Sequence, residues 1–334
     1  MGGHIGSIPP QHQPPRGLSL LQSAVIYDKF ADKVDLGAAI LELAQKGHLE
    51  IFNQNRDTDP FVKKKQKETS DLTMDQRYLL DTILFPDSDL YTLERGGDRK
   101  AEQLNEQLDT LNGMLYDWTA TEGYMHQNPS NLRDTFLSRS MMIALPLILL
   151  SVYVSFRLYD PFTVIKLMMG AIFIFLGLLI VVASLMKKNY LSVLFGALWF
   201  LLSLFGLLSV TDNVNLLYTP VLMLPVLIVS IWYFHRKIGP FRQRGVDTYR
   251  DLLAYKAFMK KDEEDKIRYL LSQDPFFLDK GIPYAVLFGL TGHWLKYYKI
   301  LDLPEPVWYH RGVESLSTFL KAVETQMIPP SSGS

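Results

Sequence analysis

The residues that could do chemistry in this chain are its seven histidines, its acidic runs and one lysine-rich stretch. No two histidines lie three or four positions apart, the spacing that lets one helix present two metal ligands. The chain has no cysteine, which excludes a disulfide framework, a thiolate metal site and a cysteine nucleophile. It also has no glycine-rich phosphate loop, no HExxH and no GxSxG. We therefore expect no catalytic residue, no metal site, no cofactor and no enzymatic activity.

The lysine-rich stretch, a loop reading VKKKQK over residues 62–67, follows a predicted strand from His48 to Phe52. Three roles stay open for it: a solvated loop, a contact with the membrane surface or a protein, and a contact with nucleic acid. Nucleic acid is the least favoured partner because this part of the chain is acidic and a reading helix over residues 36–46 would carry one lysine. The candidate interaction residues are Lys63, Lys64, Lys65 and Lys67.

Helix-capping signals organise the N-terminal part of the chain. Ser19 and Asp35 are placed to cap two helices, and Gly47 is placed to end the second in a left-handed conformation. A capping box of Thr73 and Gln76 opens a third helix, and a leucine stripe predicts a longer, core-facing helix from Asp98 to near Gly123. Two helices followed by a strand and a basic loop predict a winged-helix-like domain.

Four long apolar runs lie in the middle of the chain, at residues 140–156, 167–186, 190–210 and 214–234. A helix needs roughly 20 apolar residues to cross a hydrocarbon layer of about 30 Å, so four membrane-spanning helices are expected. Basic residues flank the block mainly on one side, for example at Arg139, Lys187 and Arg236. The positive-inside rule then places both termini in the cytoplasm.

The predicted fold class is therefore a mainly α membrane protein, in which a formal net charge of -1 hides an acidic N-terminal part and a mildly basic C-terminal part. The predicted layout is a disordered N-terminus (1–15), a winged-helix-like cytoplasmic domain (16–134), a four-helix transmembrane block (139–237), a small helical C-terminal cytoplasmic domain (238–328) and a disordered tail (329–334). The C-terminal aromatic residues fill a small core in one interpretation and form an interface between the two cytoplasmic parts, or with the membrane surface, in another.

Several motifs together resemble one family. PPRGLS (residues 14–19) and VDLGAAILELAQKGHLEI (34–51) match its N-terminal signature, followed by LTMDQRYLLDTILF and EGYMHQNP. The C-terminal part matches its LPYA segment and closing PxWY at these family-motif residues: Pro283, Tyr284, Ala285, Gly289, Trp294, Trp308 and Tyr309. The chain resembles the bacterial predicted-membrane-protein family catalogued as domain of unknown function 2207. It is similar to the C-terminal portion only, without the extracytoplasmic β-rich domain typical of members.

The resemblance implies a multi-pass protein of the bacterial inner membrane but no activity. We expect a membrane-anchored cytoplasmic interaction, scaffold or signalling protein. The alternatives are a membrane-tethered nucleic-acid-binding regulator that uses the winged-helix-like domain, and a small transporter. The expected partners are the lipid bilayer, a protein at the cytoplasmic face and, as an alternative, a second copy of the chain.

Overall fold

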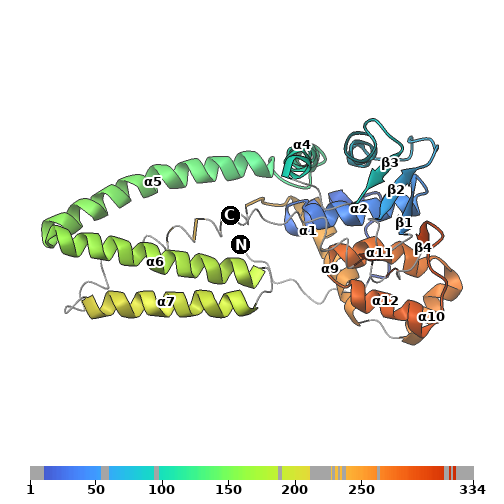
Figure 1. The fold of residues 1–334 in the computed structure, drawn as a ribbon. Helices are drawn as coiled ribbons and strands as arrows, with labels where there is room; N and C mark the ends of the chain where they lie inside the picture. The colour runs from blue at the N-terminus through green and yellow to red at the C-terminus, as the bar shows by residue number, and fades with distance from the viewer. Residues whose placement is uncertain are drawn as a thin grey trace. The chain divides into compact units, whose positions relative to one another are not determined.

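A computed structural model describes residues 11–53, 60–93, 98–186, 190–210, 238–261 and 264–311, with single residues at 227–234 and 316–320. The chain divides into two compact units. The composite unit joins residues 1–130 to residues 239–334, and the membrane block comprises residues 131–238. The fold is mainly helical, as predicted (Figure 1).

The composite unit begins with two capped helices, α1 (Leu20–Asp28) and α2 (Lys33–Gln45). Ser19 caps α1 as predicted, in a capping box with Gln22. The predicted cap of α2 was wrong by three residues: Asp32 is the N-cap, and Asp35 accepts a hydrogen bond from the Asp32 N–H as the third residue of a capping box. Either aspartate can cap a helix. The helix that begins after Asp32 is favoured because its capping box satisfies more of the N-terminal N–H groups than a helix capped at Asp35 would.

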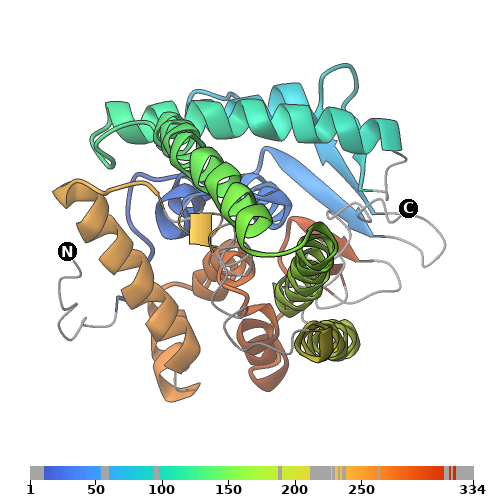
Figure 2. The ribbon, with the colours of Figure 1, turned by 90° about the vertical axis from the view of Figure 1, so that its left-hand side faces the viewer.

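Helix α2 is the centre of this unit. Residues 35–41 are all buried, and Gly47 follows with φ +78°, the left-handed helix stop expected there. Figures 1 and 2 show α1 and α2 between α4 (Asp98–Thr121) and the C-terminal helices α11 (Phe277–Leu287) and α12 (Thr291–Ile300). A helix buried on all sides belongs to a core rather than to a surface.

A four-stranded sheet in the order β3-β2-β1-β4 follows α2. Strand β1 (Leu49–Asn53) pairs antiparallel with β2 (Phe61–Lys64), which pairs antiparallel with β3 (Leu90–Thr92). The lysine-rich stretch is therefore not a loop throughout: its first residues belong to β2, because Val62 is buried against the core while Lys63 faces outward. Strand β4 (Tyr309–Arg311) comes from the other end of the chain and pairs parallel with β1.

The remaining elements complete one shared core. Helix α3 (Met74–Arg77) starts at the predicted capping box and continues as a π-helix, η1 (Tyr78–Leu84). Helices α9 (Gln243–Lys261) and α10 (Glu264–Gln273) precede α11. One hydrophobic cluster contains residues from α1, α2, β1, α4, α9, α11 and α12. The aromatic residues Tyr255, Tyr284 and Trp294 are buried in it, so segments from both ends of the chain share this core.

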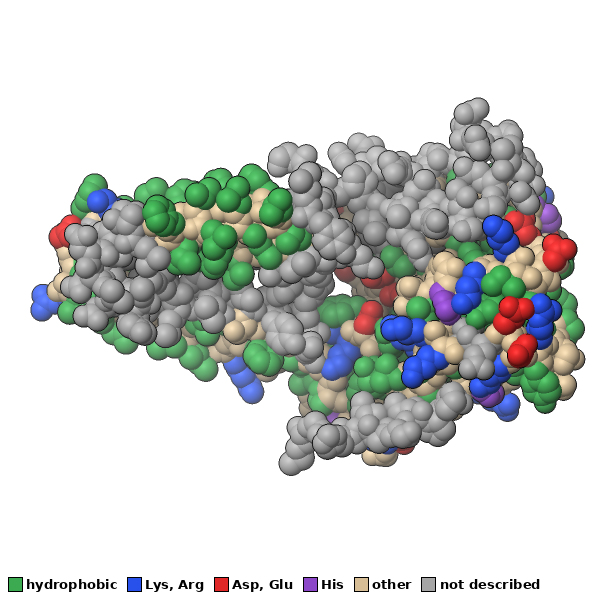
Figure 3. Space-filling view, turned by 90° about the horizontal axis from the view of Figure 1, so that it is seen from below, with side chains coloured by type: hydrophobic (Ala, Val, Ile, Leu, Met, Phe, Trp, Pro, Cys, Tyr) green, Lys and Arg blue, Asp and Glu red, His purple; other side chains and the backbone are tan. Residues whose placement is uncertain are grey.

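The membrane block contains three described helices, α5 (Pro129–Leu158), α6 (Pro161–Met186) and α7 (Tyr190–Val210). They include the first three apolar runs, whereas most of the fourth lies outside the described residues. Within the described residues, α5 alone is long and apolar enough to cross a membrane by length and composition, and only 12% of its apolar window is buried. Hydrophobic side chains dominate the described surface of this unit in Figure 3, and charged side chains are spread over the composite unit. Four spans therefore stay a prediction.

Helices α6 and α7 pack closely through glycine. A Cβ added at Gly196 would lie 2.9 Å from the Val181 backbone nitrogen, and one added at Gly177 would lie 2.9 Å from that of Phe200. Small residues allow such close helix contacts where no hydrophobic effect drives association. Gly196 belongs to the Ser192-x-x-x-Gly196 pattern, which predicts a helix contact.

Candidate functional site

The four lysines predicted for interaction lie on β2 and in the segment after it. Lys64 pairs with Asp81 at 2.8 Å, and Lys65 pairs with Glu50 at 2.8 Å. Lys67 pairs with Asp71 at 3.2 Å. Among the described residues, Lys63 is the only one of the four without a carboxylate partner. Exposed ion pairs of this kind add little stability, but they cancel much of the positive charge that the sequence indicated.

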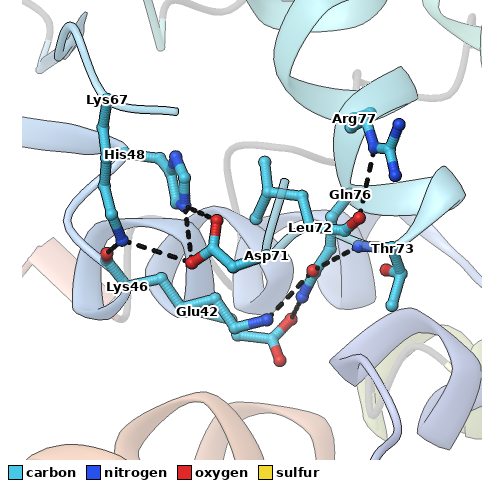
Figure 4. Close-up of polar contacts among 9 residues, drawn as sticks. All are labelled: Glu42, Lys46, His48, Lys67, Asp71, Leu72, Thr73, Gln76 and Arg77. Carbon is cyan, nitrogen blue, oxygen red and sulfur yellow. Dashed lines mark hydrogen bonds and ion pairs between the residues drawn. The ribbon is translucent and has the colours of Figure 1, made fainter. Parts of the chain in front are cut away.

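A polar network anchors this segment to the C-terminal end of α2 (Figure 4). The His48 ring is almost fully buried, and its Nε2 lies 3.1 Å from Asp71 Oδ1. The ammonium of Lys67 donates to the carbonyl of Lys46 at 2.6 Å and also to Asp71. His48 is therefore a packed residue of the fold.

A second part of the network lies between α2 and α3. The Gln76 amide donates to Glu42 Oε2 at 2.7 Å, and its oxygen accepts from Lys46 Nζ at 3.0 Å and from the Thr73 N–H at 3.1 Å. The Leu20 N–H also donates to Glu42 at 3.0 Å (Figure 4 shows the Glu42–Gln76–Lys46 group). Burial raises the pKa of the Glu42 carboxyl above its ordinary value.

Asp75 extends this network to the start of α1. Ser19 Oγ donates to Asp75 Oδ2 at 2.5 Å, and Gln22 Nε2 donates to Oδ1 at 3.2 Å. All three side chains are buried, and burial raises the pKa of Asp75. The GLS segment and the TMDQ segment therefore meet through buried hydrogen bonds. Sequence reasoning missed Asp75, Glu42 and Gln22; the S-x-x-Q spacing after Gly17 was the available signal.

The family-motif residues of α11 face this same region. Tyr284 OH lies 3.2 Å from Ser23 Oγ on α1, and burial raises the pKa of Tyr284, so its hydroxyl stays protonated. Pro283 and Ala285 are buried beside it in α11, which ends before Gly289 at φ +66°.

Trp294 and Tyr309 tie the remaining motif segments to the core. Trp294 is fully buried, and its Nε1 donates to the carbonyl of Leu278 at 2.9 Å. The Ile51 N–H on β1 donates to the carbonyl of Trp308 at 3.0 Å. Asn53 Nδ2 donates to Tyr309 OH at 3.2 Å, and both residues are buried. The closing PxWY motif therefore builds the β4–β1 pairing.

The chain leaves the composite unit and returns to it at one place. Met125 and Phe241 form an antiparallel bridge. The His126 N–H donates to the carbonyl of Pro240 at 3.1 Å, and the Arg242 N–H donates to that of Tyr124 at 2.9 Å. We call residues 124–126 and 240–242 the junction. Sequence reasoning gave no sign of this pairing.

In the part of the chain that the structure describes, no three histidine, aspartate or glutamate side chains gather as metal ligands. The carboxylates and the histidine described above are engaged in hydrogen bonds that join segments of the fold. These side chains therefore hold segments of the composite unit together, and their polar groups bind other residues of the same unit.

The described residues therefore comprise an apolar helix long enough to span a membrane and a composite unit whose distant segments are joined by buried hydrogen bonds. The chain belongs to the family described as "Predicted membrane protein (DUF2207) C-terminal domain", whose model matches residues 9–192. The resemblance of residues 282–309 lies beyond that match. No curated protein and no solved structure shows significant similarity to the chain.

Proposed function

We propose that this membrane protein is an anchored interaction, scaffold or signalling protein whose composite unit binds a protein partner in the bacterial cytoplasm. The observation that carries the proposal is the β4–β1 pairing. It makes one folded unit from the segments that precede and follow the apolar block. Such a unit is held at the membrane by two chain connections, which suits a fixed platform for a partner.

The proposed topology has four membrane helices and both termini in the cytoplasm. Its support is the concentration of basic residues around one set of helix ends, together with the apolar helices α5, α6 and α7. Reporter fusions at both termini test this topology. Periplasmic reporter activity at either end would contradict it.

An interaction role agrees better with the described polar groups than catalysis does. Asp75, Glu42 and His48 are used in packing contacts. The proposal therefore includes no catalytic site and no cofactor. A second copy of the chain is an alternative protein partner, and the lipid bilayer contacts the membrane block.

The burial of α2 weighs against the nucleic-acid alternative. A reading helix must present one face to a groove, whereas residues 35–41 of α2 have no exposed face. Three of the four lysines are also paired with carboxylates. Electrophoretic shift of the detergent-extracted chain tests this alternative, because nucleic-acid binding would weaken steeply with salt. For transport, substrate flux in proteoliposomes is the corresponding test.

Co-purification of the full chain from its own membranes tests the main proposal. We expect a defined protein that is retained by the wild type and by His310→Ala, and is lost from Tyr309→Ala. Tyr309 is buried on β4, whereas His310 next to it is only partly covered, so the pair separates loss of the composite fold from loss of one side chain. If no defined protein is retained, or if Tyr309→Ala retains it unchanged, the proposal is wrong.

A further inference from the structure

The junction is held by more than its two backbone hydrogen bonds. Arg244, at the start of α9, donates to the carbonyl of Glu122 at 2.7 Å, although the two residues are 122 positions apart in the chain. The guanidinium of Arg244 also lies over the Tyr124 ring, 4.3 Å from its centroid. Arg244 thus fixes residues 122–124, where the chain leaves the composite unit, to the first turn of α9. Residues 240–242, where the chain returns, lead directly into the same turn.

Gly245 makes this close approach feasible. A Cβ added at this residue would overlap the carbonyl oxygen of Tyr124 and would lie 2.8 Å from the Phe241 ring. The Tyr124 carbonyl is the same group that accepts the Arg242 N–H. A side chain at position 245 must therefore push the departing segment away and break the junction hydrogen bond.

Helix α9 connects the junction to the rest of the composite unit, because a lysine and a tyrosine on α9 contact aromatic residues of other helices. Lys256 Nζ donates to Tyr27 OH at 2.5 Å and lies 5.6 Å from the centroid of the Phe288 ring. Tyr249 packs against Tyr27 with ring centroids 6.4 Å apart. Cation–π and aromatic contacts of this kind hold the end of α1 against α9.

The segment that precedes α1 also rests on α9. The His12 ring contacts the Phe258 ring with centroids 4.8 Å apart, and Gln11 lies beside the Asp251 carboxyl. A single rigid helix therefore contacts the junction at its first turn and residues 11–28 along its length.

We propose that the junction and α9 form a coupling device, in which a change in spacing between the two ends of the membrane block shifts the docking of α9 on residues 11–28. The block is continuous with the junction at both ends, since its residues 131–238 lie between the two paired segments. Displacing either segment moves the first turn of α9, and a helix transmits that displacement along its axis. The coupling does not depend on the partner of the composite unit, so its failure would leave the proposed function standing.

Gly245→Ala tests the coupling by opening the junction from within. Hydrogen exchange is measured on the full chain in detergent or nanodiscs. We expect exchange to rise by about tenfold, which corresponds to about 1.4 kcal/mol of opening free energy, at the junction and also along residues 249–258 and the end of α1. Gly113→Ala is the matched control, because Gly113 also lies in a helix and a Cβ there meets nothing within 4 Å. Faster exchange confined to the junction would overturn the proposal.

A disulfide between Met125→Cys and Phe241→Cys tests the same coupling in the opposite direction. The chain has no cysteine of its own, so no native thiol competes with this pairing. The oxidised protein is expected to exchange more slowly than its reduced form along residues 249–258. Equal exchange in the two forms would contradict the coupling even if Gly245→Ala failed to fold.

Discussion

Gly281 has no side chain at the point where the ring of Trp294 lies against α11. A Cβ added there would be 2.5 Å from Trp294 Cζ2, closer than carbon atoms approach in proteins. The Trp294 ring is fully buried and hydrogen-bonded to Leu278, so it has little room to move. This fit fixes how α12 packs on α11.

Gly281→Ala is therefore expected to destabilise the composite unit by about 1–3 kcal/mol, the usual cost of forcing a methyl group into a filled core. The measurement is a thermal or denaturant unfolding curve of the detergent-extracted chain. Gly292→Ala in α12 is the control, because a Cβ there meets nothing within 4 Å. Equal stability of the two variants would show that Trp294 can shift freely.

Ser19→Ala should cost more than an ordinary helix cap. Its hydroxyl accepts the Gln22 N–H and donates to Asp75, so the change removes a cap worth about 1 kcal/mol and a hydrogen bond to a buried carboxyl worth about 1–3 kcal/mol. Ser88→Ala, whose hydroxyl accepts the Leu90 N–H at an exposed turn, is expected to stay within about 0.5 kcal/mol of the wild type. Similar losses in unfolding free energy for both variants would contradict the buried network.

Asp35→Asn is expected to stabilise the chain at neutral pH. Burial, and then repulsion by Asp32 and Asp28, hold the pKa of Asp35 well above its ordinary value. The folded state therefore binds this proton more tightly than the unfolded state, and the stability it confers is complete below the ordinary carboxyl pKa and lost as pH rises through the raised one. Asparagine keeps an oxygen acceptor for the Asp32 N–H and carries no charge.

The advantage of Asp35→Asn over the wild type should be smallest at low pH and should grow as the pH rises through the raised pKa of Asp35, because only the wild type then carries a buried charge at this position. Unfolding curves at several pH values measure it. Asp87→Asn, at an exposed position, is the control and should show no such trend. A constant difference across pH would mean that Asp35 is not protonated preferentially in the fold.

Gly196→Ala should weaken the α6–α7 contact. Its methyl group would meet Ile180 at 2.8 Å and the Val181 backbone at 2.9 Å, so the helices must separate. We expect a loss of about 1–3 kcal/mol in unfolding free energy in detergent micelles. Leu194→Ala removes a larger side chain from an exposed position of the same helix and is expected to have a smaller effect. The reverse order would contradict the packing.

Local signals in the sequence predicted much of the fold. The cap at Ser19, the stop at Gly47 and the capping box from Thr73 to Gln76 are confirmed because each depends on neighbours within a few residues. The strand after His48 is confirmed by its alternating burial. The cap of α2 was placed at Asp35 because Asp32 and Asp35 carry the same chemistry and local pattern alone does not rank them.

The candidate site depended on contacts that no local pattern contains. Asn53 and Tyr309 are hydrogen-bonded although 256 positions separate them, and Ser19 reaches Asp75 across 56 positions. Counting charges along the sequence also overstated the unpaired positive charge of the lysine-rich stretch. Lys64 and Lys67 are paired with Asp81 and Asp71, which come from later segments of the chain. Which distant segments pair depends on how the whole core packs, and no local sequence pattern contains that information.

The parallel pairing of β4 with β1 also sets an order of events during synthesis. At roughly 5–20 residues per second, Tyr309 leaves the ribosome about 13 to 50 s after Asn53, the residue it binds across 256 positions. All of the apolar block is made in that interval, while α2 still lacks the α11 surface that covers it. The composite unit can therefore be completed only after the block has been synthesised, and a chain stalled before α11 exposes the apolar surface of α2 that chaperones and proteases recognise.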